Sequence, residues 1–289
     1  MLSILIPVYN YNIVSLVEEI QTQTTALQIP FELLAFEDGS KSRLNEQNKQ
    51  INLLSGCMFK ELEVNIGRSA IRNLLAQNAQ YEQLLFVDAG SYPKKKTFIK
   101  EYLTSFHEDV VIGGMTNLDK PPSKPYKLRW LYTKKRESNF KNGKVFCSSN
   151  FLIKKSVIQA HPFDENIKKY GCEDVLFFTD LKKHDISITY IDNPVIHDSE
   201  DSADSFIFKT ENAIENLVIL IASGKLSTNA YRLTQIYEGL QKLKLDMLVA
   251  FIFSKSKPLL KRNFRSSSPS ILLFDFYRLG YYCSIINKR

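Results

Sequence analysis

The sequence predicts an α/β protein whose mixed, mostly parallel sheet is flanked by helices, with a helical appendage at the C-terminal end. Signals for strands and helices alternate through the first half of the chain, as they do in proteins with parallel sheets. The expected strands are continuous apolar runs, which is typical of strands covered on both faces. From about Ser205 onward the pattern becomes helical.

Length and composition are those of an ordinary globular protein. The 289 residues contain 44% hydrophobic and 24% charged side chains. No apolar run approaches the roughly 20 residues needed to cross a bilayer, and the opening apolar stretch at 3–8 is too short for a signal peptide. The cysteines are scattered without a CxxC pair, which argues against a zinc ribbon or a disulfide framework. We therefore expect a cytoplasmic protein.

The first half of the chain supplies the elements of the expected parallel sheet. An apolar run at 2–8 predicts a buried strand, and a polar loop at 9–12 follows it. Leu16, Val17 and Ile20 then recur with helical spacing. The next elements are a strand at 31–36, a helix at 44–54, a strand at 59–64, a turn at 65–69 that opens a helix, and a strand at 84–87.

The regular alternation stops after the apolar run at 110–114. A proline-rich segment at 121–125 predicts a rigid loop, and later strands are expected at 150–153 and 187–191. We place a domain boundary near residue 204, which gives one domain at 1–204 and a helical region at 205–289.

The net charge of +7 is concentrated in that helical region. From Ser205 onward the chain has 13 basic and 5 acidic residues, so the preceding part is close to neutral. A basic surface can meet the phosphates of nucleic acid, lipid headgroups or a nucleotide, or it can be a solvated helical face. No helix-turn-helix, zinc or RNP pattern accompanies it, so we expect no nucleic-acid partner.

Polar clusters follow the expected strands directly. These are Tyr9-Asn10, Glu37-Asp38 and Asp88. In parallel sheets, ligands bind beyond the carboxyl ends of the strands. One edge of the sheet should therefore collect acids, an amide and an aromatic ring, which makes it the candidate site.

Each acidic cluster has a structural interpretation beside the functional one. The segment Glu37–Ser40 is typical of a turn or helix N-cap, but a carboxylate there could also accept hydrogen bonds from uracil or ribose. Asp88 follows four apolar residues and could cap a turn or bind a hard cation or ribose.

Two later segments allow the same pair of interpretations. Glu173 and Asp174 open an apolar helical run, where acids stabilise the helix dipole. Burial beside another acid would also raise a pKa and suit a general base. His197 is an isolated histidine just beyond a strand, and it becomes a metal ligand only if the fold brings it to Asp88.

The order of these segments resembles family 2 glycosyltransferases of the GT-A fold, the bacterial enzymes that build surface polysaccharides. The resemblance covers roughly residues 1 to 200. It rests on the opening strand Ser3–Asn10, the "DDGS"-like Glu37–Ser40, the "N-x-G-x-x-x-A-R-N"-like helix from Asn65 to Asn73, the strand into Asp88, the "G-x-E-D"-like Gly171–Asp174, and His197.

The resemblance implies a Rossmann-like GT-A domain with a donor half at about 1–115 and an acceptor half at about 116–204. Its nucleotide-binding residues would be Pro7, Val8, Tyr9, Glu37, Asp38, Arg72 and Asp88. Asp174 would be the catalytic base that deprotonates the acceptor hydroxyl. Asp88 and His197 would hold Mg²⁺ or Mn²⁺, which would act as a Lewis acid for the leaving group.

The implied activity is inverting transfer of a sugar from a nucleotide-diphosphate sugar, with UDP the expected nucleotide, to a glycan or lipid-linked acceptor. Such an acceptor would place the protein at the cytoplasmic face of the inner membrane. The basic region, with Lys255, Lys257, Lys261, Arg262 and Arg265 beside the apolar run 248–253, could provide a peripheral membrane contact.

The sequence departs from the family pattern at Gly90, which stands where a second acid usually binds the metal. Three explanations compete. In the first, Asp88, His197 and the donor diphosphate are enough to bind the cation. In the second, basic residues stabilise the leaving group without a metal. In the third, the protein is a non-catalytic scaffold with a transferase-like fold.

Overall fold

A computed structural model describes residues 1–138, 148–197 and 201–287, and the chain divides into two compact units. The first unit comprises Met1–Leu118, Lys134–Lys168 and Glu173–Asp198, and the second comprises Asp119–Thr133, Lys169–Cys172 and Ser199–Arg289. The sequence predicted a boundary between two domains near residue 204. The division into compact units does not test this boundary, which stays a prediction.

A seven-stranded sheet organises the first unit, with the strand order β3-β2-β1-β4-β8-β6-β9. Its strands are β1 (Leu2–Val8), β2 (Phe31–Glu37), β3 (Cys57–Glu61), β4 (Gln83–Val87), β6 (Val110–Ile112), β8 (Asn150–Lys154) and β9 (Ile188–Tyr190). Strand β8 pairs antiparallel with β4 and β6, and the other neighbours pair in parallel. The predicted α/β class with a mixed, mostly parallel sheet is confirmed.

A second, three-stranded sheet has the order β5-β10-β7. Its strands are β5 (Ser91–Pro93), β7 (Met115–Asn117) and β10 (Val195–His197). His197 is therefore the last residue of a strand, whereas the sequence placed it just beyond one.

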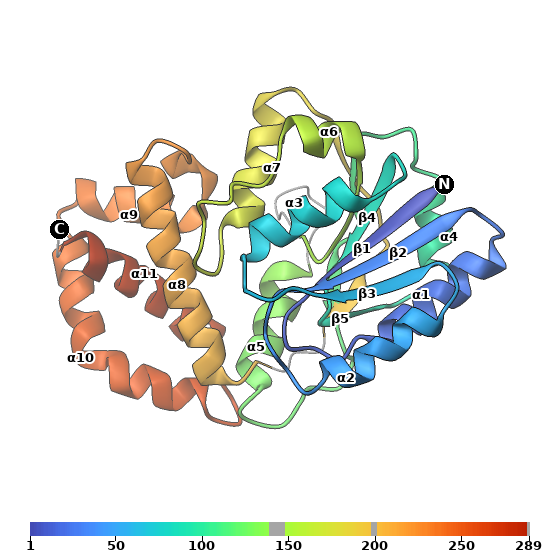
Figure 1. The fold of residues 1–289 in the computed structure, drawn as a ribbon. Helices are drawn as coiled ribbons and strands as arrows, with labels where there is room; N and C mark the ends of the chain where they lie inside the picture. The colour runs from blue at the N-terminus through green and yellow to red at the C-terminus, as the bar shows by residue number, and fades with distance from the viewer. Residues whose placement is uncertain (139–147, 198–200, 288–289) are drawn as a thin grey trace. The chain divides into compact units, whose positions relative to one another are not determined.

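Helices cover the large sheet, as Figure 1 shows for α1 and α3 on its opposite sides. The helices of the first unit are α1 (Val14–Ala26), α2 (Asn45–Asn48), the 3₁₀ helix η1 (Lys49–Leu53), α3 (Arg68–Asn78), α4 (Phe98–Leu103), α6 (Lys155–Ala160) and α7 (Glu173–Lys183).

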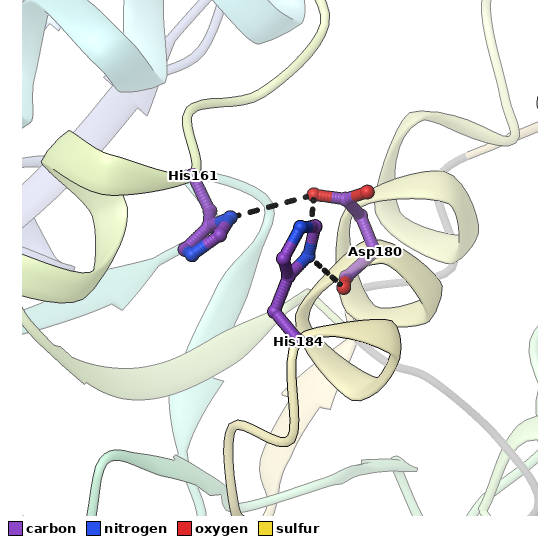
Figure 2. A group of neighbouring side chains, drawn as sticks. All are labelled: His161, Asp180 and His184. Carbon is purple, nitrogen blue, oxygen red and sulfur yellow. Dashed lines mark hydrogen bonds and ion pairs between the residues drawn. The ribbon is translucent and has the colours of Figure 1, made fainter.

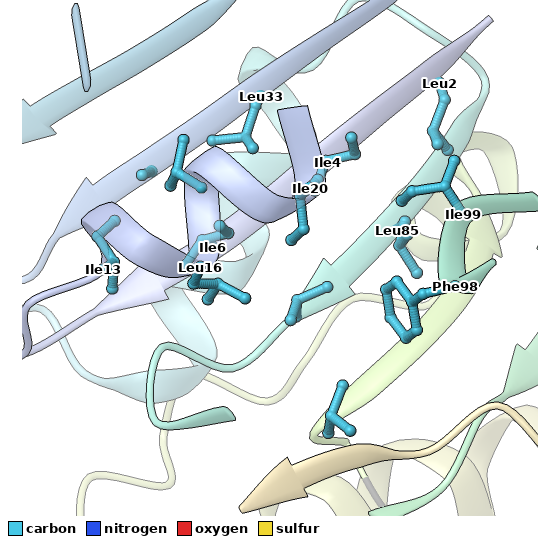
Figure 3. Close-up of a cluster of buried hydrophobic side chains, with 14 of the residues drawn as sticks. Leu2, Ile4, Ile6, Ile13, Leu16, Ile20, Leu33, Leu85, Phe98 and Ile99 are labelled. Carbon is cyan, nitrogen blue, oxygen red and sulfur yellow. The ribbon is translucent and has the colours of Figure 1, made fainter. Parts of the chain in front are cut away.

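Alternate residues of each central strand enter two separate cores. In β1, Ile4 and Ile6 pack into the core shared with α1 and α4, which Figure 3 shows, whereas Leu5 packs into the core on the other face. In β4, Leu85 and Phe86 divide in the same way. Burial on both faces explains why these strands are continuous apolar runs.

The segment at 44–54, predicted as a single helix, is one turn of α-helix followed by a 3₁₀ helix. Its asparagines bind backbone groups elsewhere: Asn48 accepts from Ile13 N and donates to Tyr11 O, and Asn52 bonds both ways with Phe59. Such side-chain bonds compete with regular helix formation.

Strand β3 lies at Cys57–Glu61 rather than at the predicted 59–64, because its pairing with β2 ends at Glu37↔Glu61. After the strand, Leu62 N still donates to the carbonyl oxygen of Glu37 at 2.8 Å, and the backbone N–H groups of Ile66 and Gly67 donate to the Asp38 carboxylate.

The second unit is helical. Its helices are α5 (Lys127–Tyr132), α8 (Ala203–Ala222), the 3₁₀ helix η4 (Thr228–Ala230), α9 (Arg232–Lys242), α10 (Asp246–Phe264) and α11 (Ile271–Ile286). The π-helical turn η2 (Thr133–Glu137) follows α5 and belongs to the first unit from Lys134 onward. An aromatic-rich core joins α5, α8, α10 and α11. Within the described part of the chain, no helix is long and apolar enough to span a membrane.

Candidate active site

Two buried carboxylates stand at the end of β2. Glu37 is fully buried and accepts hydrogen bonds from Asn10 N at 3.3 Å and Ser40 N at 3.0 Å. Asp38 is almost fully buried, and its two oxygens accept from Ile66 N at 2.7 Å and Gly67 N at 3.0 Å. Both side chains therefore shape the loops around the site, and their contact with a nucleotide stays a prediction.

The two contacts of Asp38 fix the start of α3. Gly67 lies just before the helix with φ 94°, a left-handed conformation that favours glycine. Burial raises the pKa of Asp38 above its ordinary value, and the bonds from the two backbone N–H groups offset only part of that rise by stabilising the charged form.

We expect Asp38→Ala to lower the free energy of unfolding by about 1–3 kcal/mol, because two buried N–H groups lose a charged acceptor. Asp38→Asn retains one acceptor oxygen and should recover part of that loss. Urea unfolding of the three proteins checks this, and an alanine variant as stable as the natural chain would contradict it.

The end of β1 lies beside these loops through the register Val8↔Glu37. Val8 is buried in the core, so only its backbone is available to a ligand, while Pro7 is half-buried. Tyr9 is exposed to 57% and carries the only large ring among these residues. A stacking role toward a nucleobase therefore falls to Tyr9, and it stays a prediction.

An ion pair connects α3 to the end of β4. Arg72 Nη2 lies 2.9 Å from Asp88 Oδ1, and the Arg72 side chain is only 3% exposed. Its guanidinium also lies 5.5 Å from the centre of the Phe163 ring. Asp88 keeps about a third of its side chain exposed, and its Oδ2 has no hydrogen-bond partner among the described residues.

Asp174 lies in the first turn of α7, where its Oδ1 accepts from Val175 N at 2.8 Å. Burial, followed by the charge of Glu173, raises the pKa of Asp174 to about 7. The charge of Arg72 lowers this pKa and that of Asp88 raises it further. The fold thus brings Asp88, Arg72 and Asp174 into one electrostatic cluster.

Glu173 precedes Asp174 and is 6% exposed. Its Oε1 lies 3.9 Å from Arg68 Nη1, and its Oε2 has no hydrogen-bond partner among the described residues. A second acid buried at this place supports the raised pKa of Asp174, since two neighbouring carboxylates resist ionising together.

His197 pairs with Ser91 across the three-stranded sheet. Ser91 in turn donates through its N and Oγ to the carbonyl oxygen of Asp88, at 3.2 and 2.6 Å. The fold therefore connects His197 to Asp88 through one strand pairing and one turn, with Gly90 inside that turn. A metal ion at this place stays a prediction.

The sequence placed Asn73 at the end of the motif-like helix but gave it no role, and it did not indicate Phe163. Asn73 bonds in both directions with the backbone of Phe163 at 3.0 Å and donates to Glu165 at 2.8 Å, which places the ring that covers Arg72. The only sequence signal for this was the position of Asn73 beside Arg72 in the helix.

The loop before α7 is held within the second unit. Asn216 of α8 donates to the carbonyl oxygens of residues 169, 170 and 171 at 2.9–3.2 Å. Gly171 has φ 96°, and an added Cβ would lie 2.4 Å from Cβ of Ala213, so only glycine fits there. The chain enters α7 immediately after this loop.

The segment between Met115 and Asn150, which we expect to shape the acceptor pocket, is described only in part. Residues 139–147 of this segment lie outside the described residues.

Comparisons with known proteins match the first part of the chain to one family. The family model for "Glycosyl transferase family 2" matches residues 3–161, which is more than half of the chain. No curated protein sequence matches.

Solved structures resemble the whole fold at low identity. One is the mannosyltransferase PcManGT from Pyrobaculum calidifontis in complex with GDP-Man and Mn²⁺, which is 13% identical to this chain with a TM-score of 0.57. The match covers 99% of this chain and 86% of PcManGT. S. aureus TarS 1-349 in complex with UDP is 18% identical with a TM-score of 0.51, covering 100% and 92%.

Proposed function

The chain belongs to glycosyl transferase family 2 and is a glycosyltransferase that uses a nucleotide sugar, and we propose that it transfers the sugar with inversion to a hydroxyl group of a glycan or lipid-linked acceptor in surface-polysaccharide synthesis. The observation that carries this proposal is the cluster of Asp174, Arg72 and Asp88, with the pKa of Asp174 raised to about 7 by burial.

In the proposed reaction Asp174 is the general base. It takes the proton of the acceptor hydroxyl as that oxygen forms a bond to the anomeric carbon. The bond from this carbon to the diphosphate oxygen breaks, and its electron pair leaves with the nucleotide diphosphate. A base with a pKa near the working pH is efficient at such a proton transfer.

The other residues of the cluster would handle the donor. Arg72 holds Asp88 in place and lends positive charge to the side of the site where the diphosphate departs. Glu37, Asp38 and Tyr9 would border the base and ribose, with Pro7 and Val8 contributing the end of β1.

The donor set offered to Mg²⁺ or Mn²⁺ is one carboxylate and one imidazole, from Asp88 and His197. The unbonded Oδ2 of Asp88 suits a hard cation, and such ions commonly combine one or two protein ligands with phosphates and water. The cation would supply Lewis-acid stabilisation of the leaving diphosphate.

UDP is the proposed nucleotide, because a structural relative binds UDP, and GDP is the competing one, because another binds GDP-Man. Incubation with a panel of UDP- and GDP-sugars, with release of the free nucleotide diphosphate as the readout, tests the proposal. Turnover of one donor that requires Asp174 supports it. Nucleotide binding without turnover of any donor would support the non-catalytic scaffold instead.

We also propose that the second unit contacts an anionic membrane surface through α10. Met247, Leu248, Phe251, Ile252 and Leu259 are all exposed, at 46–72%, and Lys255 and Arg262 are exposed beside them. A groove of about 550 Å³ between α10 and α11 continues this apolar surface. Apolar side chains among cations suit the interface of an anionic bilayer.

Two of the basic residues suggested by the sequence are engaged elsewhere. Lys257 pairs with Glu211 at 3.0 Å and lies over the rings of Tyr277 and Tyr281. Arg265 pairs with Asp204 at 2.6 Å. Lys261 is half-buried, so the cations that we assign to the membrane contact are the exposed Lys255 and Arg262.

We expect Leu248→Glu combined with Phe251→Glu to weaken binding to vesicles with a quarter anionic lipid by about 10-fold, because two apolar anchors are replaced by repelled charges. Leu53→Glu alters a side chain that is 87% exposed in the other unit and is the matched control. Sedimentation of the full chain with vesicles measures this. Unchanged binding would contradict it, and loss of self-association instead would assign the surface to a second copy.

A further inference from the structure

Two histidines and an aspartate meet where the end of α6 faces the C-terminal half of α7 (Figure 2). His161 follows α6, Asp180 lies in the last turn of α7, and His184 directly follows α7. Their candidate ligand atoms all lie within 4.8 Å of one another. We propose that these three side chains bind a divalent transition metal such as Zn²⁺, at a site separate from Asp88 and His197.

The ligand set is chemically suited to such an ion. Two imidazole nitrogens and one carboxylate oxygen form the combination used by zinc sites with a position open to water. Among residues 1–138, 148–197 and 201–287, no other group of three such side chains comes this close. Hard cations that prefer all-oxygen ligands are poor candidates here.

The backbone brings the three ligands to one place without strain. Asp180 lies in the last turn of α7 and His184 directly follows the helix, with His184 N donating to the carbonyl oxygen of Asp180 at 3.3 Å, so the two side chains lie on the same face. Nδ1 of each histidine lies 3.7 Å from Oδ2 of Asp180, so this one carboxylate oxygen faces both rings. The rings themselves have centres 4.3 Å apart.

The side chains retain the freedom to close around an ion. Tetrahedral metal–ligand bonds of about 2.0–2.2 Å separate the ligand atoms by about 3.3–3.6 Å, so the two Nδ1–Oδ2 distances of 3.7 Å need to shorten only slightly. His184 and Asp180 are 52% and 46% exposed, so their rotamers can adjust without disturbing a core. His184 Nδ1 also lies 3.0 Å from the carbonyl oxygen of Asp180, which keeps its ring against α7.

A bound metal would fasten α6 to α7, the helix that carries Glu173 and Asp174 in its first turn. Both helices belong to the first unit, so the link would stabilise that unit directly. Any effect on sugar transfer rests on the proposed function, whereas metal binding and the gain in stability do not. A ligand that binds only the folded chain raises its unfolding temperature.

The test uses the full chain after treatment with a chelator and needs no sugar donor. Calorimetric titration with Zn²⁺ should show one site, and Co²⁺ in its place should give visible d–d absorption. We expect His184→Ala and His161→Ala each to weaken Zn²⁺ binding by more than about 10-fold. Removing a residue that only hydrogen-bonds to a metal ligand already costs about that much affinity. Zn²⁺ should also raise the unfolding temperature of the natural chain and not that of the variants.

Two further variants separate this site from others. His107→Ala removes a histidine that lies 3.1 Å from Glu108 on an exposed surface and should leave Zn²⁺ binding unchanged. Asp88→Asn should also leave it unchanged. Absence of Zn²⁺ binding by the natural chain, or equal binding by His184→Ala, would overturn the proposal, as would loss of binding in Asp88→Asn.

Discussion

Replacing Asp174 by asparagine is expected to lower the rate of sugar transfer by about 10²- to 10⁴-fold, the usual contribution of a positioned general base. Asparagine keeps the oxygen that accepts from Val175 N, so the first turn of α7 should remain intact. Nucleotide binding should therefore change little. Transfer assays with a donor identified in the screen, together with UDP titration, measure both quantities.

The pH dependence gives an independent signature of this role. Because burial raises the pKa of Asp174 to about 7, its carboxyl is partly protonated at neutral pH and cannot then accept a proton. Transfer by the natural enzyme should rise with pH through this region and level off above it. The residual activity of Asp174→Asn should lack this rise.

The same variant should be more stable than the natural chain at alkaline pH. The folded-state pKa of Asp174 exceeds its ordinary value of 3.8, so between these two values the folded chain binds more protons than the unfolded chain. Stability then falls as pH rises through that window. Asparagine cannot ionise, so we expect a gain of about 1–2 kcal/mol at pH 8 and less at pH 5. Asp174 is only half-buried, so solvent screening keeps this gain below the value that its full pKa shift would give.

Asp185→Asn is the matched control. Asp185 follows α7 with φ 58°, a conformation that asparagine also tolerates. The Asp185→Asn substitution should leave the rate of sugar transfer, the pH profile of that rate and the free energy of unfolding unchanged. Full activity of Asp174→Asn would remove Asp174 from the proposed reaction, and an unfolded Asp174→Asn protein would assign it a structural role.

We expect Asp88 and the residue at position 90 to decide whether the proposed donor site uses a cation. We expect Mn²⁺ to strengthen UDP binding by the natural chain, and Asp88→Asn to abolish that enhancement. Gly90→Asp restores the second acid of the family pattern. One added charged ligand is worth about 1.5–3 kcal/mol, so it should increase the Mn²⁺-dependent affinity by about 10- to 100-fold.

The backbone at Gly90 admits this substitution, because Gly90 is not among the glycines with positive φ. Gly90→Asn is the matched control, with similar size and no charge, and it should reproduce little of the gain. Calorimetric titration of the four proteins with UDP, with and without Mn²⁺, gives the effect of the cation on each. UDP binding that is indifferent to Mn²⁺ in both the natural chain and Gly90→Asp would contradict a metal site and favour stabilisation of the leaving group by basic residues such as Arg72.

The sequence alone determined the fold class and most strand positions. Strands β1, β2 and β4 are buried on both faces, so their sequences are continuous apolar runs that stand out without knowledge of their neighbours. The motifs at Glu37–Ser40, Asn65–Asn73 and Gly171–Asp174 likewise indicated the family, because each is a local pattern at a strand end or helix start. The predicted family is confirmed.

Tertiary structure decided what those residues touch. Arg72 forms an ion pair with Asp88, lies against the ring of Phe163 and lowers the pKa of Asp174. These contacts join segments that are far apart in the sequence. The limits of β3 followed from its partner strand, and the grouping of His161 with Asp180 and His184 followed from helix packing. Local sequence records which side chains are buried and which turns they favour, whereas long-range contacts depend on how the packed elements bring distant residues together.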